Sequence, residues 1–88
     1  MIKDDLFIVS HSACAPCEIV KDIVNGQLPV YDIGISDDAW NLIQKGKISG
    51  VPAVLEKVGD DYRKCDLKIL DDRITIDCGE KHLEIRKK

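Results

Sequence analysis

The sequence lacks the features of an exported, membrane-bound or nucleic-acid-binding protein. Its N-terminal segment has no long apolar run: Leu6–Val9 is short and follows two aspartates, which fits neither a signal peptide nor a membrane span. Basic residues are not in excess either, because 13 Lys and Arg stand against 16 Asp and Glu for a formal net charge of -3. Such a chain has no basic field for nucleic acid or an anionic membrane. We therefore expect a cytoplasmic protein with no nucleic-acid and no membrane partner.

Internal repeats, low-complexity segments and linkers are also missing from the sequence. The 88 residues suffice for one domain with a single modest core and leave no room for a second. We therefore expect one domain over residues 1–88, present as a monomer or a weak dimer.

Strand and helix patterns alternate in the first half of the chain. Leu6–Val9 is continuously apolar, as in a strand buried on both faces, and we expect it to be the central strand. Residues 17–25 have the apolar spacing of a helix, which Asn25 and Gly26 end with a left-handed stop. Residues 29–35 are typical of a second strand. This order predicts a right-handed parallel crossover.

A second helix is predicted over residues 37–45. Ser36 is a good N-cap, and Asp37 and Asp38 suit the positive end of the helix dipole. Apolar residues of this segment supply its buried surface, and we expect Trp40 to lie in the core.

The second half of the chain changes character. Ala53–Val58, Tyr62–Leu70 and Arg73–Cys78 are strand-like runs separated by short polar turns. We expect them to form an antiparallel meander. Residues 80–88 fit either a further strand or one or two turns of helix.

Cys14 and Cys17 bracket Ala15 and Pro16 between the first strand and the first helix. At a helix N-terminus, unpaired backbone N–H groups and the positive end of the dipole favour a thiolate and lower the pKa of the first cysteine. Proline is tolerated there because its missing N–H has no helical partner. We interpret Cys14 as an exposed nucleophile and Cys17 as the resolving thiol. A reduced, inert pair and half of a metal site remain alternatives.

A second motif, Gly50-Val51-Pro52, leads into the third strand. Together with the C-A-P-C sequence upstream, it resembles the thioredoxin superfamily and is similar to its small glutaredoxin-like members over about residues 6–70. The resemblance implies a cis Val51–Pro52 bond beside the disulfide. It also implies that the backbone near Val51 binds an extended substrate segment, with Ala15 and Pro16 lining the site.

The fold that the resemblance implies is α/β and thioredoxin-like. Its mixed sheet has strand order 2-1-3-4 flanked by helices, and here a β-rich C-terminal end replaces or shortens the last helix. The missing helix would leave part of one sheet face bare, to be covered by the tail or by a second subunit.

The implied function is that of a protein disulfide oxidoreductase without a cofactor. Its partners would be protein disulfide substrates and a thiol or reductase that donates electrons. Ala13 and Ile8 stand where thioredoxins carry a tryptophan and a buried aspartate, and no Gly-Gly turn follows Pro52. The proton acceptor and the electron donor therefore stay open. A zinc-binding adaptor with four cysteines and a redox-inactive interaction module are the alternatives.

Cys65 and Cys78 are the remaining cysteines. If Leu70 and Arg73 close a two-residue turn, Cys65 falls opposite Cys78 at a non-hydrogen-bonded position, where Cα atoms are about 4.5 Å apart and a disulfide can form. Reduced core thiols are our first interpretation, a second disulfide the next, and zinc shared with the other two cysteines the third.

Overall fold

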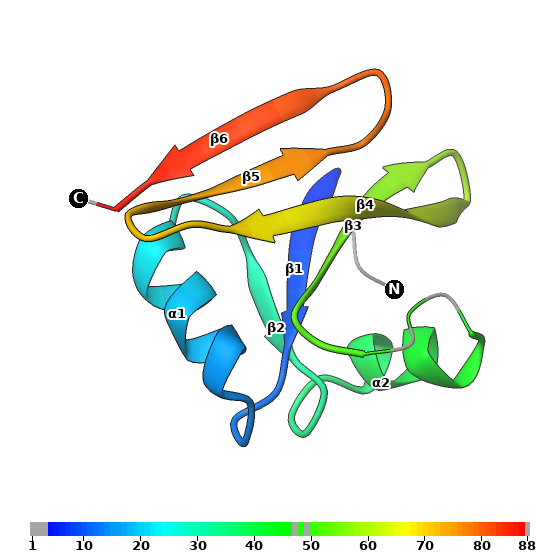
Figure 1. The fold of residues 1–88 in the computed structure, drawn as a ribbon. Helices are drawn as coiled ribbons and strands as arrows, with labels where there is room; N and C mark the ends of the chain where they lie inside the picture. The colour runs from blue at the N-terminus through cyan, green and yellow to red at the C-terminus, as the bar shows by residue number, and fades with distance from the viewer. Residues whose placement is uncertain (1–3, 47, 49, 88) are drawn as a thin grey trace.

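The structure is a computed structural model that describes residues 4–46, 48 and 50–87. Within these ranges, six strands form one mixed sheet with two helices (Figure 1). None of the helices in the described part of the chain is long and apolar enough to cross a membrane. The elements in chain order are β1 (Leu6–Ser10), α1 (Ala15–Val24), β2 (Val30–Asp32), α2 (Asp37–Gln44), β3 (Ala53–Val58), β4 (Asp61–Ile69), β5 (Arg73–Asp77) and β6 (His82–Arg86).

The sheet has the strand order β2-β1-β3-β4-β5-β6. The pair β1 and β2 is parallel, and every other neighbouring pair is antiparallel. The expected order of the first four strands, the parallel crossover and the antiparallel meander are therefore confirmed. β1 bonds to a strand on each side but lies second from one edge, so its assignment as the central strand is wrong for the whole sheet.

Helix α1 begins two residues earlier than predicted, at Ala15. Cys14 is its N-cap, and Pro16 occupies the first turn, where its missing N–H breaks no helical bond. The helix ends at Asn25, whose φ of 45° is left-handed, and Gly26 continues that stop with a φ of 84°.

The segment between β2 and α2 differs from the prediction. β2 covers only three residues because the Asp32 carboxylate accepts a hydrogen bond from the Gly34 N–H at 2.7 Å and turns the chain. Ile35, predicted to end a longer second strand, lies outside β2 and is 85% exposed. Ser36 caps α2 as expected, through a 3.3 Å bond from the Ala39 N–H. Trp40 was expected in the core but lies 46% exposed on this helix.

The apolar side chains of β1 and β3 point alternately to the two faces of the sheet. Members of both sets are buried. α1 covers one face and α2 the other. The cluster under α1 also contains residues of the C-terminal meander. Its buried members are Ile8, Val20, Ile23, Val24, Val54, Cys65, Ile74, Ile76, Cys78 and Ile85. The cluster under α2 contains Phe7, Val9, Ala39, Leu42, Ile48, Ala53 and Leu55.

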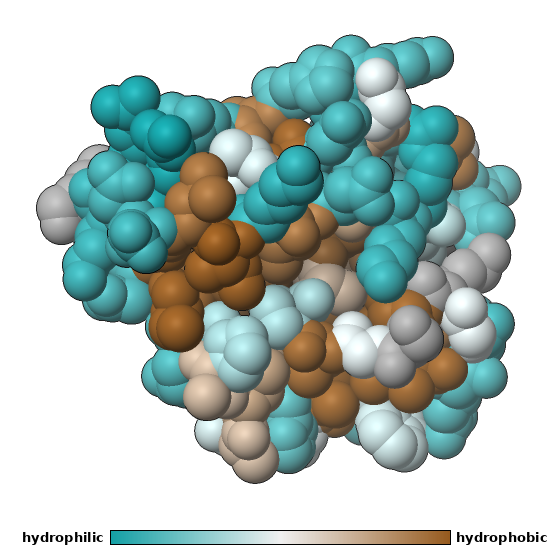
Figure 2. Space-filling model, in the orientation of Figure 1, coloured by the Kyte–Doolittle hydropathy of each residue, from teal (hydrophilic) through white to brown (hydrophobic). Residues whose placement is uncertain are grey.

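The C-terminal end of the described chain extends the sheet beyond β4 and packs against α1. Residues 82–86 form β6, which resolves the ambiguous end of the sequence as a strand. Ile74 of β5 and Ile85 of β6 join the cluster under α1, and Lys87 bonds to Asp22 of α1 at 2.8 Å. The opposite face of the meander is polar, and Figure 2 shows hydrophilic side chains along the upper rim where Figure 1 places β5 and β6. Its residues are Asp66, Lys68, Arg73, Thr75, Asp77, His82, Glu84 and Arg86.

Candidate functional site

The two cysteines of the C-A-P-C segment lie at the start of α1, one at the N-cap and the other in the first turn. Cys14 and Cys17 are joined as a disulfide, and their Cα atoms are 5.2 Å apart. Cys14 is partly exposed, whereas Cys17 is 0% exposed and packs inward. This is the division that the sequence predicts between an accessible sulfur and a sheltered one.

The backbone at the helix start points at the Cys14 sulfur. The Cys17 N–H donates to Cys14 Sγ at 3.2 Å, and the Glu18 N–H donates to the Cys14 carbonyl at 3.3 Å. The first N–H groups of a helix have no helical acceptor and carry the positive end of the dipole. A negative charge on Cys14 Sγ is therefore favoured at this place once the disulfide is reduced.

The loop before β3 brings Val51 and Pro52 to the same sulfur. The peptide bond between them is cis, as the resemblance implied. The carbonyl oxygen of Val51 lies 3.7 Å from Cys14 Sγ. Both residues are half-buried, while Ala15 and Pro16 are exposed on the helix side of the sulfur. The four residues predicted to line a substrate site therefore lie in the two segments that meet at Cys14.

The turn that enters α1 is fixed by His11. The His11 Nδ1 accepts a hydrogen bond from the Ala13 N–H at 3.3 Å, and its carbonyl accepts one from the Cys14 N–H at 3.2 Å. The imidazole thus shapes the loop through a local bond. Both bonds position Cys14 at the end of the turn that follows β1.

Two buried polar residues were not singled out from the sequence. Ser10 ends β1 and is 0% exposed, and its Oγ has no hydrogen-bond partner among the described residues. Glu56 is 7% exposed and lies opposite Leu6, at the end of β1 remote from Cys14. Its carboxylate is held by Arg63 at 2.7 Å and Lys81 at 3.8 Å. The charge at the site therefore comes from backbone dipoles and not from this carboxylate.

The second cysteine pair lies in the meander. The Leu70 N–H bonds to the Arg73 carbonyl at 2.8 Å, and Asp66 faces Asp77, which confirms the predicted register. Cys65 and Cys78 are joined as a disulfide with Cα atoms 4.4 Å apart. Of the alternatives that the sequence left open, the structure contains the disulfide and not our first interpretation, two reduced thiols. Both cysteines are buried in the cluster under α1.

The described residues contain no group of three or more His, Cys, Asp or Glu side chains placed to hold a metal ion. The four cysteines occupy two separate disulfides, so they do not form one tetrahedral set.

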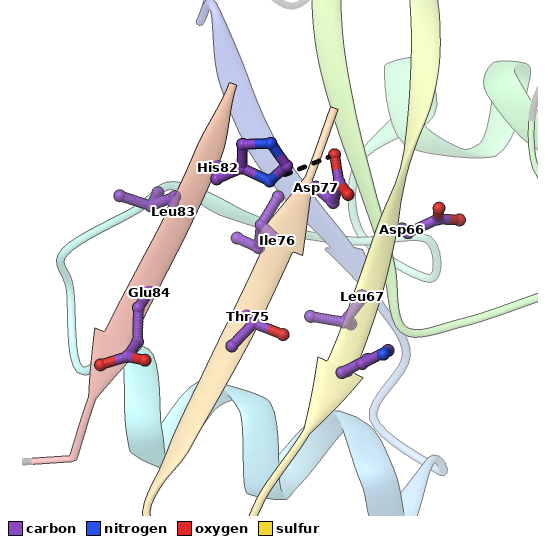
Figure 3. A pocket seen from close by; sticks show the side chains of 9 residues that line it. Asp66, Leu67, Thr75, Ile76, Asp77, His82, Leu83 and Glu84 are labelled. Atoms are coloured by element: carbon purple, nitrogen blue, oxygen red, sulfur yellow. Dashed lines mark ion pairs between the residues drawn. The ribbon is translucent and has the colours of Figure 1, made fainter. Parts of the chain in front are cut away.

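A groove of about 650 Å³ crosses the polar face of the meander (Figure 3). His82 and Asp77 face each other across β5 and β6, with the Nδ1 and Oδ1 atoms 3.5 Å apart. Asp77 Oδ1 also accepts a bond from the Gly79 N–H at 2.8 Å, which fixes the β5–β6 turn. The pair is thus part of a turn, and no cysteine lines the groove.

Comparisons with protein-family models, with curated proteins and with solved structures find no match to this chain. The function proposed below therefore depends on the geometry around Cys14.

Proposed function

We propose that the protein is a thiol-disulfide oxidoreductase with a thioredoxin-like fold, and that the Cys14–Cys17 pair is its redox centre. The observation that carries the proposal is the position of Cys14 Sγ. This sulfur accepts a hydrogen bond from the Cys17 N–H at 3.2 Å and lies 3.7 Å from the Val51 carbonyl oxygen. A helix start on one side favours the thiolate. A cis-proline segment on the other side offers backbone groups to an extended substrate.

The reaction begins from the reduced pair. The Cys14 thiolate attacks one sulfur of the substrate disulfide, forms a mixed disulfide and releases the other substrate sulfur as a thiolate. The Cys17 thiolate then attacks Cys14 Sγ, which forms the Cys14–Cys17 disulfide and releases the second substrate thiolate. The two substrate thiolates take up, through solvent, the two protons that the Cys14 and Cys17 thiols lose. The substrate disulfide is reduced by two electrons, and the protein dithiol is oxidised to the disulfide seen in the structure.

An external thiol or a reductase must return two electrons to Cys14–Cys17 for a further cycle. We place the protein in the cytoplasm as part of the same proposal, because such donors are abundant there. The Cys65–Cys78 disulfide is sheltered from them, since its cysteines are only 2% and 6% exposed. Access governs the rate of thiol exchange, so the two disulfides should react separately.

The proposal is tested by following the reduction of a protein disulfide, such as that of insulin, with a dithiol as reductant. Wild type should accelerate the reaction, and Cys14→Ser should reduce the rate to that of the reductant alone because the attacking sulfur is gone. Cys17→Ser should still form the mixed disulfide and then stall, which mass spectrometry detects as a covalent adduct at Cys14.

The matched control is Cys65→Ala with Cys78→Ala, which removes the other disulfide. This variant should keep the activity if it remains folded. If Cys14→Ser were as active as wild type, or if the activity followed Cys65 and Cys78, the assignment of the redox centre would be wrong.

A further inference from the structure

Strand β4 changes partners half-way along its length. Residues 61–65 pair with β3, and residues 66–69 pair with β5. Figure 1 shows the end of β4 passing over α1 while the start of β3 turns away toward α2. The edge of residues 66–69 on the side of β3 is therefore met by no strand in the part of the chain that the structure describes.

The register identifies the backbone groups on this free edge. In an antiparallel pair, alternate residues exchange hydrogen bonds with the neighbouring strand. The Leu70 N–H bonds to the Arg73 carbonyl, so Lys68 also points its backbone groups at β5. Leu67 and Ile69 then point their N–H and C=O groups to the opposite side. Cys65, two residues before Leu67, points its backbone groups to the same side and pairs with Val54 of β3.

A pocket of about 320 Å³ lies at this free edge. Side chains from both faces of β4 line it, which places it at the strand edge and not on one face. Its remaining wall is Pro52 and Ala53 at the start of β3. Proline has no N–H for a ladder, so β3 cannot continue along β4 past Pro52. The residues that line the pocket are Pro52, Ala53, Lys64, Cys65, Asp66, Leu67 and Ile69.

Pro52, which lines the pocket, is one residue from the site around Cys14. The preceding residue, Val51, has its carbonyl 3.7 Å from Cys14 Sγ. Apolar surface extends from the far end of the pocket, where Ile69 is 37% and Leu70 is 41% exposed. Figure 2 shows apolar surface gathered in the region where Figure 1 draws the end of β4 and α1.

We propose that an extended segment of the polypeptide substrate, next to its disulfide, adds as a strand to the free edge of β4 at Leu67 and Ile69. This inference rests on the proposed redox function and names its substrate class: an extended polypeptide with apolar side chains. Strand addition takes its affinity from main-chain hydrogen bonds and its selectivity from pockets for alternate side chains. Lys64 and Asp66 carry opposite charges on the rim, so the pocket selects for neither sign.

A proline at position 69 tests the edge without breaking the β4–β5 ladder. Ile69→Pro removes the N–H that points into the pocket, and proline is tolerated at strand edges in that orientation. Ile69→Ala is the matched control, since it removes the apolar side chain but keeps the N–H. Loss of one hydrogen bond should make kcat/KM toward a peptide disulfide about two- to tenfold lower for Ile69→Pro than for Ile69→Ala.

A small aromatic disulfide separates the two proposals. Both variants should react with it at the rate of wild type, because it has no strand to add. If wild type reduces neither substrate, the redox function itself is wrong. If wild type reduces both and the two variants are equal on the peptide, the redox function stands and strand addition to β4 is wrong.

A second measurement keeps the natural backbone. Cys17→Ser is trapped as a mixed disulfide with a synthetic peptide that carries one cysteine between valine and threonine residues. Amide hydrogen exchange at Leu67 and Ile69 should slow at least about tenfold relative to the adduct with free cysteine, as expected for new backbone bonds. Equal exchange in the two adducts would overturn the inference, even if Ile69→Pro failed to fold.

Discussion

Cys14 has two roles that use one sulfur atom. As the N-cap of α1, its Sγ accepts the Cys17 N–H, and as the outer sulfur of the disulfide it faces Val51. Both roles need the sulfur at the boundary between loop and helix, and Pro16 fits that boundary without cost. Substitution of Cys14 therefore changes a cap as well as the proposed nucleophile, whereas Cys17 is buried and contributes to packing.

Tyr31 gives the fold a pH dependence that is independent of the cysteines. Its hydroxyl donates a hydrogen bond to the Asp4 carboxylate, and this bond, with desolvation and the nearby negative charges, raises the pKa of Tyr31 above 10.0. The folded state therefore binds this proton more tightly than the unfolded chain does. The stabilisation is complete below pH 10.0 and is lost as the pH rises through the higher value in the folded state.

We predict that Asp4→Ala lowers the pKa of Tyr31 toward its ordinary value. Ultraviolet absorbance of the phenolate measures it, in a Tyr62→Phe background that leaves Tyr31 as the only tyrosine. The same protein with Asp4 intact is the control. Identical titration curves for the two proteins would contradict the role given to the Asp4 carboxylate.

Several single residues show where the sequence was and was not sufficient. Cys14, Cys17 and Ser36 were predictable because caps and helix starts depend on local spacing. Trp40 and Ile35 were not, since hydrophobicity alone does not distinguish a core position from an exposed one beside a tight turn. Ser10 gave no signal, because its burial depends on α1 folding back over β1.

The meander is the element that sets this chain apart from a sheet with a third helix. β5 and β6 supply Ile74, Ile76 and Ile85 to the cluster under α1 and turn a polar surface outward. Its register followed from the turn between Leu70 and Arg73, since one closed turn fixes every opposite pair along a hairpin. The disulfide was one of several outcomes compatible with that register, and sequence could not choose among them.

The Cys65–Cys78 disulfide should stabilise the meander mainly by restricting the unfolded chain. The two cysteines are 13 residues apart, and closing such a loop contributes about 3 kcal/mol. We predict that Cys65→Ala with Cys78→Ala lowers the free energy of unfolding by about this amount in chemical denaturation.

The matched control removes the other disulfide, through Cys14→Ser with Cys17→Ala, so that a hydroxyl at residue 14 can still cap α1. That pair spans a separation of only three residues, so the loss should be smaller by roughly 1 kcal/mol. A larger loss from the shorter loop would contradict this account of the two disulfides.

At the scale of the whole molecule, the fold brings together segments that are distant in sequence. The α1 start and the loop before β3 meet because β1 pairs with β3, and the end of β4 lies beside Pro52 because β4 pairs with both β3 and β5. The sequence predicted the first meeting through the resemblance of two motifs. It did not predict the free edge of β4, because the residues of a strand do not indicate that the strand changes its pairing partner along its length.

The central claim is that the start of α1 favours the thiolate of Cys14. In Cys17→Ala, Cys14 is the one cysteine outside a disulfide, while the N–H of residue 17 that points at its sulfur is retained. The measurement is the alkylation rate of Cys14 as a function of pH, in the folded protein and in the same protein unfolded by denaturant with Cys65–Cys78 intact. The pH at half of the maximal rate should be lower in the folded protein, and an equal or higher value would contradict the account.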